Sequence, residues 1–319
     1  MTGGWNRARI VRWASRAGLA VLVLFASSAV AAKWEEISGS FERVTWSPDP
    51  LALAASVAIL AASLALNPSG WMILARELGS DTPVAGLRAA WFASQLGRYM
   101  PGKIWLFAGR IGFLRSEGLS TARAVAASVW ELIAGAAAAG AVALPCILLS
   151  GATGIVPAVR TAAAAAAAAM LLLPLLGPVQ KAAFALEGGA AFTGIGTATG
   201  LRVAGLFCAL WAARGISLHL WLTGLGLETR GFWPVMAAAP LSWLAGYIVF
   251  VVPGGIGVRE TVIAALVAPS GTAGPVVVAC LGQTLLMAVL EILLALPSFR
   301  AAPGARGIAK GGTDDAASG

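Results

Sequence analysis

Six long apolar segments constrain the fold of this chain more than any other feature of its sequence. They cover residues 17–34, 51–74, 124–149, 160–177, 203–224 and 274–297. A helix of about 20 apolar residues is long enough to cross a hydrocarbon core of about 30 Å. Charged residues make up 11% of the chain, against about 25% of a soluble domain. The alternation typical of an outer-membrane barrel is absent, so the sequence predicts an all-α polytopic membrane protein.

Charged residues near the ends of these segments indicate the orientation of the chain. The N-terminal tail, residues 1–16, carries four arginines and no acid, and basic loops favour the cytoplasmic side. Residues 76–123 hold seven basic and three acidic side chains and are expected inside, whereas Glu228 and Arg230 are expected outside. We therefore expect an inner-membrane protein with both termini in the cytoplasm. The first segment also resembles a signal peptide, but another span follows shortly, which favours an uncleaved helix.

Two further apolar stretches, residues 83–117 and 232–268, are each interrupted by Pro-Gly. The first contains GRYMPGKIWLFAGR from residue 97, and the second contains VFVVPGGIGVRE from residue 249. Proline ends the helix before it, and broken backbone at membrane depth must be covered by protein or line a cavity. Each stretch is therefore predicted to be a re-entrant hairpin. Because residues 232–252 are long enough to cross alone, we expect six to eight transmembrane helices.

An offset of 152 residues relates the two Pro-Gly stretches. It pairs Pro101 with Pro253, Gly102 with Gly254, and also Glu131 with Gln283. On the charge map the two breaks open to opposite sides, so we expect an inverted-topology repeat, with repeat 1 at about 51–149 and repeat 2 at about 203–297. Both repeats belong to a single transmembrane domain, residues 17–298. Residues 299–319 are predicted to be a disordered cytoplasmic tail because they are rich in Gly, Ala and Asp.

Inverted repeats place the substrate site at their interface, with broken helices pointing their ends at it. A helix N-terminus after Pro-Gly offers free N–H groups to an anion, and nearby cations would add to this. Glu131 and Arg214 lie inside spans, where ionisable groups are costly; they either pair with each other or act on the substrate. Tryptophans such as Trp71 are predicted to lie in interfacial belts. The candidate substrate-binding residues are Arg98, Tyr99, Pro101, Gly102, Lys103, Arg110, Glu131, Arg214, Pro253, Gly254, Gly255, Arg259, Glu260 and Gln283.

Most of the chain, from about residue 15 to 298, resembles the lysylphosphatidylglycerol synthase transmembrane-region, or flippase-like, family. The resemblance is carried by SQLGRYMPGKIWLFAGRIGFLRSEGLSTARAVAASVWELI and by VVPGGIGVRETVIAALV. It implies the flippase half of such proteins without their cytosolic synthetase domain. Leu132 and Gln283 depart from the pattern, because basic residues are expected after Glu131 and near Gln283.

Other function classes find little support in the composition. Three cysteines without tight spacing and a single histidine argue against a disulfide framework, a metal site and a cofactor. The basic residues are scattered at the ends of spans, which is not a nucleic-acid signature. No Walker motif is present, so ATP hydrolysis by the chain itself is not expected.

The leading hypothesis is a lipid flippase that moves an anionic or amphiphilic lipid, either an aminoacyl-phospholipid or a polyprenyl-phosphate-linked sugar. One alternative is a membrane-embedded glycosyltransferase whose acids would be Glu35, Glu36, Glu42 and Asp49. Another is a non-transporting anchor for a separate synthase. The expected partners are membrane lipids, with a synthase or glycosyltransferase as a further candidate. The sequence leaves the oligomeric state and the lipid open.

Overall fold

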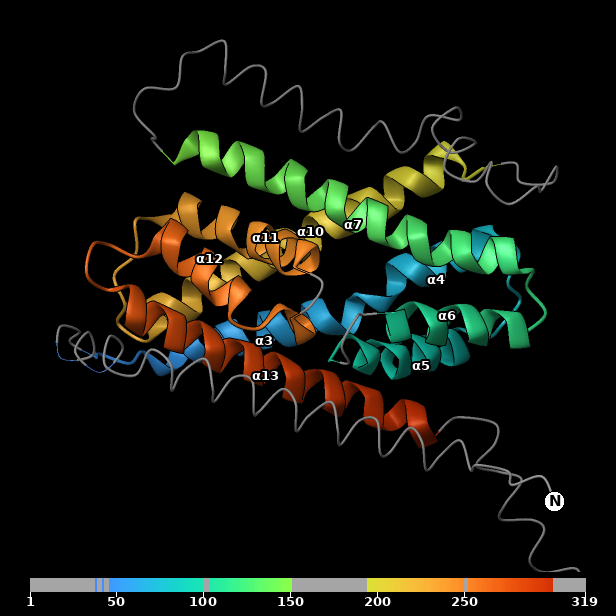
Figure 1. The fold of residues 1–319 in the computed structure, drawn as a ribbon, viewed down its shortest axis with the longest axis horizontal. Coiled ribbons are helices and arrows are strands. Elements are labelled where there is room, and N and C mark those ends of the chain that lie inside the picture. Colours follow the sequence, from blue (N-terminus) through green and yellow to red (C-terminus); the bar gives the residue numbers. More distant parts are fainter. Residues whose placement is uncertain are drawn as a thin grey trace, which may run out of the picture.

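The computed structural model describes Ser38, Glu42 and residues 46–99, 104–150, 194–249 and 252–300. Within these ranges the regular elements are helices, and no β-strand occurs (Figure 1). The elements are α3 (Pro50–Leu66), α4 (Pro68–Glu77), α5 (Val84–Gln95), η1 (Leu96–Tyr99), α6 (Ile104–Ser116), α7 (Thr121–Leu149), α10 (Thr197–Gly224), α11 (Phe232–Ile248), η4 (Pro253–Gly255), α12 (Val258–Val267) and α13 (Ala273–Arg300).

Four helices in the described part of the chain are long and apolar enough to cross a membrane. They are Pro50–Glu77, in which α3 and α4 are joined through Asn67, Thr121–Leu149, Thr197–Gly224 and Ala273–Leu296. These helices coincide with the apolar segments at 51–74, 124–149, 203–224 and 274–297, and they are consistent with a multi-pass helical membrane protein. The spans expected at 17–34 and 160–177 and the tail at 1–16 lie outside the described residues. The tail expected at 299–319 starts inside α13, which ends at Arg300, and its remaining residues, 301–319, also lie outside them.

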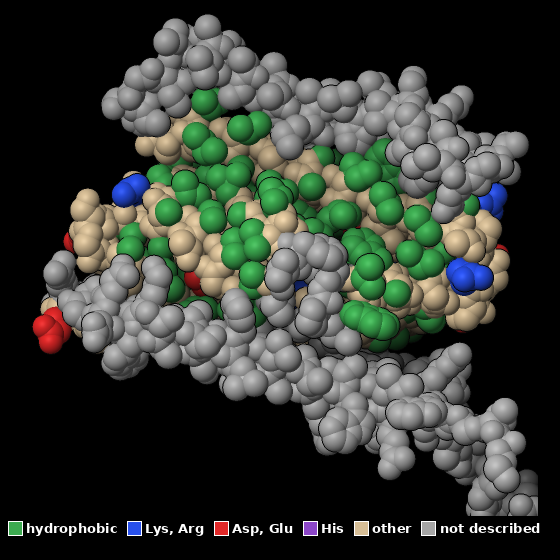
Figure 2. Space-filling view, viewed as in Figure 1, with side chains coloured by type: hydrophobic (Ala, Val, Ile, Leu, Met, Phe, Trp, Pro, Cys, Tyr) green, Lys and Arg blue, Asp and Glu red, His purple; other side chains and the backbone are tan. Residues whose placement is uncertain are grey.

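The surface agrees with a membrane environment. On the face drawn in Figure 2, hydrophobic side chains fill the middle, and most of the visible charged side chains lie toward the two ends of the long axis. Large apolar side chains such as Leu51, Ile104 and Leu293 are more than half exposed. An exposed apolar belt of this kind is costly in water and favourable in lipid.

Two helical hairpins occupy the places where the Pro-Gly breaks were predicted. In the first, α5 and α6 flank η1, and at its base the Thr82 hydroxyl donates to the Glu117 carboxylate at 3.4 Å. In the second, α11 and α12 flank η4, and at its base the Arg230 N–H donates to the Val267 carbonyl at 2.8 Å. The hairpins lie toward opposite ends of the long axis (Figure 1), and η1 contacts η4 in the interior.

The helices repeat with the offset that the sequence predicted. Adding 152 to the first residue of α7 gives 273, where α13 begins, and adding it to the start of α6 gives 256, two residues before α12. Each repeat therefore contains a long apolar helix, a helical hairpin and a second long helix. The hairpin of each repeat packs against the second long helix of the other repeat, because α5 contacts α13 and α11 contacts α7.

The first long helices of the two repeats run antiparallel. At one end the Asp49 N–H donates to the Gly224 carbonyl at 2.8 Å. In the middle the Ser56 hydroxyl donates to the Ser217 carbonyl at 2.7 Å, and the Ser217 hydroxyl donates to the Ser56 carbonyl at 3.0 Å. At the other end the Glu77 carboxylate accepts from the Gly196 N–H at 3.1 Å. These contacts fix the antiparallel register of α3–α4 against α10 along the whole length.

Candidate functional site

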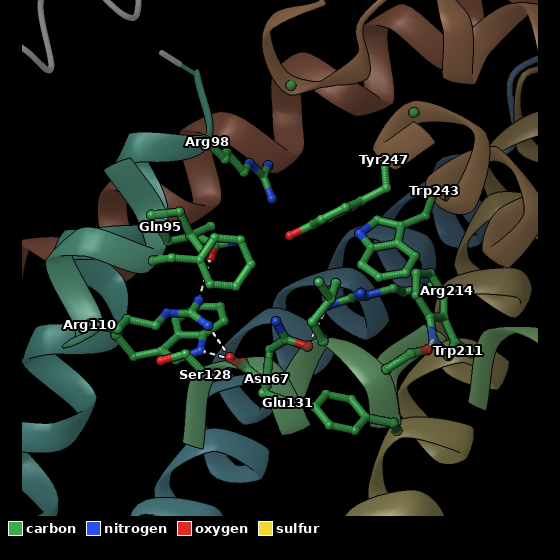
Figure 3. A pocket seen from close by; sticks show the side chains of 18 of the residues that line it. Asn67, Gln95, Arg98, Arg110, Ser128, Glu131, Trp211, Arg214, Trp243 and Tyr247 are labelled. Atoms are coloured by element: carbon green, nitrogen blue, oxygen red, sulfur yellow. Dashed lines mark hydrogen bonds and ion pairs between the residues drawn. The ribbon is translucent and has the colours of Figure 1, made fainter. Parts of the chain in front are cut away.

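A cavity of about 100 Å³ lies where the two repeats meet. A site for one water needs only about 10–15 Å³ in the same measure, so this cavity has room for a small polar group. Its walls come from Asn67 at the junction of α3 and α4, the two hairpins, α7 and α10. Its polar lining includes four arginines and one glutamate: Arg98, Arg110, Arg214, Arg259 and Glu131. Figure 3 shows Arg98, Tyr247 and Arg214 reaching toward a common space from different elements.

One wall is a buried ion pair between the first hairpin and α7. Arg110 is 3% exposed, and its guanidinium pairs with the Glu131 carboxylate. The Trp91 indole N–H donates to the other Glu131 oxygen at 2.8 Å, and Arg110 also donates to Gln95 at 2.9 Å. Glu131 therefore pairs with Arg110, and the predicted alternative of a Glu131–Arg214 pair is wrong. The reason is that α6 packs against α7, which places Arg110 next to the Glu131 carboxylate.

Arg214 stands on the other side of the cavity, in the middle of α10. One of its terminal nitrogens donates to the Asn67 side-chain oxygen at 2.9 Å, and its guanidinium lies 5.1 Å from the centre of the Trp211 ring. Among the described residues Arg214 forms no ion pair, and its buried Nε has no hydrogen-bond partner. Asn67 reaches this position because Pro68 lacks an N–H and interrupts the helix between α3 and α4.

Arg98 joins the break of the first hairpin to the last helix of the other repeat. Its guanidinium lies 2.8 Å from the Glu291 carboxylate, and the two side chains are 18% and 2% exposed. Arg98 is one of the predicted site residues and lines the cavity, whereas Glu291 was not among the predicted site residues. The first hairpin folds inward against α13, so both charges are covered by protein.

The second break is built from glycines in conformations that other residues rarely adopt. Gly254, Gly255 and Gly257 have φ values of 64°, 74° and 86°, in the left-handed region that favours glycine. Gly255 also lies directly against Gly246 of α11, where an added Cβ would come within 2.9 Å of the Gly246 Cα. This close contact brings Gly254 and Arg259 to the cavity wall.

Three predicted site residues of repeat 2, Gly255, Glu260 and Gln283, do not line the central cavity. Glu260 is fully buried, and its carboxylate accepts from the Gly257 N–H and from the Thr284 hydroxyl, both at 2.6 Å. It therefore caps α12 and ties it to α13. Gln283 donates to the Ser217 hydroxyl at 3.2 Å and lines a second, smaller cavity, which shares Arg214 and Arg259 with the first.

Pro101, Gly102 and Lys103 lie outside the described residues, and for Tyr99 and Pro253 only the backbone, in η1 and η4, is described. Asn67, Gln95 and the aromatic lining were not predicted from the sequence; the aromatic lining includes Trp91, Trp211, Trp243 and Tyr247. Asn67 and Gln95 carried a usable signal, because each is a lone amide inside an apolar stretch. Trp71 is fully buried in the core, so its predicted place in an interfacial belt is wrong.

The cavity carries an excess of positive charge. Four guanidiniums face it, against the Glu131 carboxylate in its wall and the Glu291 carboxylate behind Arg98. Four minus two leaves a formal excess of two positive charges among the described side chains. Such a site favours anions, because arginine presents a planar fork of donors to phosphate or carboxylate. The described residues contain no cluster of three or more metal-ligating His, Cys, Asp or Glu side chains.

Comparisons with protein-family models and with curated proteins found no match to this chain.

Proposed function

We propose that this chain is a lipid flippase of the inner membrane, with cytoplasmic termini, six to eight spans and a fold like that of the lysylphosphatidylglycerol synthase transmembrane-region family. The substrate is a lipid with an anionic or amphiphilic headgroup, either an aminoacyl-phospholipid or a polyprenyl-phosphate-linked sugar. The observation that carries this proposal is the cavity with four arginines at the meeting point of two hairpin breaks. Charged groups at such depth are costly and usually serve function.

The hairpins support alternating access. Helix α5 has 12 residues and α6 has 13, so at about 1.5 Å per residue each is about 20 Å long. That length reaches only part of the way across a core of about 30 Å. Because α3–α4 and α10 are antiparallel, the second repeat is inverted relative to the first, and its hairpin enters from the opposite side. In inverted-repeat transporters, broken helices form the substrate site near the midplane, and rocking of one repeat against the other exposes that site to each side in turn.

The enzyme alternative has little support in the described residues. Of its four proposed acids, Asp49 is engaged as the N-cap of α3, where its side chain accepts from the Leu51 and Ala52 N–H groups at 2.9 and 3.2 Å. An N-cap of this kind is a structural role. The anchor alternative predicts that changes in the cavity leave function intact.

Leaflet exchange tests the proposal. Purified protein in vesicles is expected to move a headgroup-labelled phosphatidylglycerol or polyprenyl-phosphate sugar between leaflets, as measured by access of a membrane-impermeant quencher. Arg259→Ala is expected to lower the exchange rate at least about ten-fold, which corresponds to about 1.4 kcal/mol. Asp49→Asn keeps a good N-cap but removes the acid, so it is the matched control and is expected to stay within about two-fold of the wild type.

Exchange that needs the protein and is lost with Arg259→Ala supports transport through the cavity. Absence of protein-dependent exchange for every anionic lipid rejects the flippase. Loss of exchange in Asp49→Asn with unchanged exchange in Arg259→Ala would favour the enzyme alternative.

A further inference from the structure

The chemistry of the cavity distinguishes between the two substrate classes, because one class has a cationic headgroup and the other an anionic one. A lysyl ester of phosphatidylglycerol has a headgroup of net positive charge, whereas a polyprenyl-phosphate sugar or an unmodified phosphatidylglycerol is negative. This inference rests on the proposed lipid transport and asks which headgroup charge the site accepts.

A cationic headgroup finds no available carboxylate in the wall of the cavity. Both oxygens of Glu131 are engaged, one by Arg110 and the other by Trp91 at 2.8 Å. The carboxylate of Glu291 lies 2.8 Å from Arg98 and is 2% exposed. An ammonium group would therefore have to displace a guanidinium from a buried pair, and breaking such a pair leaves a buried charge uncompensated.

An anionic headgroup, by contrast, finds Arg214. The buried Nε of Arg214 has no hydrogen-bond partner among the described residues, and a terminal nitrogen of the same guanidinium donates to the neutral Asn67 oxygen at 2.9 Å. An unfilled buried donor is costly, and a phosphate oxygen would fill it with a charge-assisted bond. The Trp211 ring, 5.1 Å from the guanidinium, holds it in place. Arg259 lies in the same wall and adds positive charge near this point.

We propose that the transported headgroup is a phosphate ester of net negative charge, that its phosphate binds at Arg214, and that cationic aminoacyl headgroups are rejected. The lining around Arg214 is aromatic and amide-bearing, with Trp211, Trp243 and Asn67, which suits a neutral sugar or glycerol attached to that phosphate. The shared chemistry is the phosphate ester, and the lipid that supplies it is decided by experiment.

The test compares headgroup charge in the same vesicles. Labelled phosphatidylglycerol, a polyprenyl-phosphate sugar and lysyl-phosphatidylglycerol are offered at equal mole fraction to the wild type, Arg214→Gln, Arg214→Lys and Arg115→Gln. Arg115 is exposed at the end of α6, so Arg115→Gln removes one positive charge without touching the cavity. We expect at least one anionic lipid to exchange about ten-fold or more faster than the lysyl lipid. We expect Arg214→Gln to remove this preference, Arg214→Lys to retain part of it, and Arg115→Gln to retain all of it.

Equal or faster exchange of the lysyl lipid overturns the inference while leaving lipid transport intact. Preservation of the preference in Arg214→Gln overturns the assignment to Arg214.

A binding measurement separates the inference from the transport function: glycerol 3-phosphate and inorganic phosphate are titrated calorimetrically into the purified protein. Binding of glycerol 3-phosphate that is weakened at least about ten-fold by Arg214→Gln supports the inference even if no lipid moves. Absence of Arg214-dependent binding to either probe, or binding of inorganic phosphate alone, overturns it. Thermal unfolding midpoints of the Arg214 variants within a few degrees of the wild type show that the fold is retained.

Discussion

Replacing Glu131 with glutamine is expected to destabilise the protein by about 3 kcal/mol, because removing one partner of a buried ion pair leaves the other charge without compensation. Arg110 is 3% exposed and has Glu131 as its ion-pair partner. Glutamine has nearly the same shape and can still accept from Trp91, so the change isolates the charge. In a thermal unfolding experiment in detergent, the midpoint is expected to fall by at least about 5 °C.

The second member of the pair provides the control. In Arg110→Met combined with Glu131→Gln, no buried charge remains at the pair. Most of the lost stability is therefore expected to return. Asp81→Asn, at an exposed site, is expected to change stability by no more than about 0.5 kcal/mol. An unchanged midpoint in Glu131→Gln would mean that the pair does not stabilise the fold and that Glu131 is retained for another role.

Replacing Gly255 with alanine is expected to have a comparably large effect on both stability and transport. The φ of 74° costs any non-glycine residue about 1 kcal/mol or more. The new Cβ would also lie 2.9 Å from the Gly246 Cα, and this backbone overlap can be relieved only by moving η4 away from α11, at a further cost of about 1–3 kcal/mol. Because η4 meets η1 at the cavity, the movement is expected to lower leaflet exchange at least about ten-fold.

Two other glycines separate the causes of this effect. Gly118 has a φ of 92° but no atom within 4 Å of an added Cβ, and Gly112 has open space around it inside a helix. Gly118→Ala is expected to show the backbone strain alone, and Gly112→Ala is expected to be close to neutral in stability. Both should exchange lipid at nearly the wild-type rate. If Gly255→Ala lowered stability and leaflet exchange no more than Gly118→Ala does, the close packing of the second break against α11 would contribute to neither.

Much of the fold could be predicted because long apolar segments and Pro-Gly breaks are local signals. The start of α13 and the pairing of Pro101 with Pro253 follow from one offset that is visible in the sequence. The site was harder to predict than the fold, because the partner of a buried charge depends on which helices contact each other. Arg110 and Glu131 are 21 residues apart, and only the return of α6 along α7 brings them together. Arg98 and Glu291 come from different repeats, and their pairing requires the inward fold of the first hairpin.

The aromatic lining escaped prediction for a different reason. Tryptophan is common both at membrane interfaces and in protein interiors, so composition does not distinguish the two places. Trp91 and Trp211 are buried and donate hydrogen bonds to Glu131 and to the Gly135 carbonyl, whereas Trp46 and Trp233 are about 40% exposed. The difference is set by the packing of α5 against α13 and of α10 against α7, which a single sequence does not reveal.

The proposed transport requires that the two hairpins enter the membrane from opposite sides and meet at the arginine-rich cavity. Single cysteines at Glu117 and at Arg230, the bases of the first and second hairpins, test it most directly, in a background where the three native cysteines are replaced by alanine. Labelling of intact cells or sealed vesicles with a membrane-impermeant maleimide is expected to modify the cysteine at position 230 from the outside and the one at position 117 only from the cytoplasmic side. Modification of both positions from the same side would contradict the inverted arrangement and, with it, alternating access to the cavity.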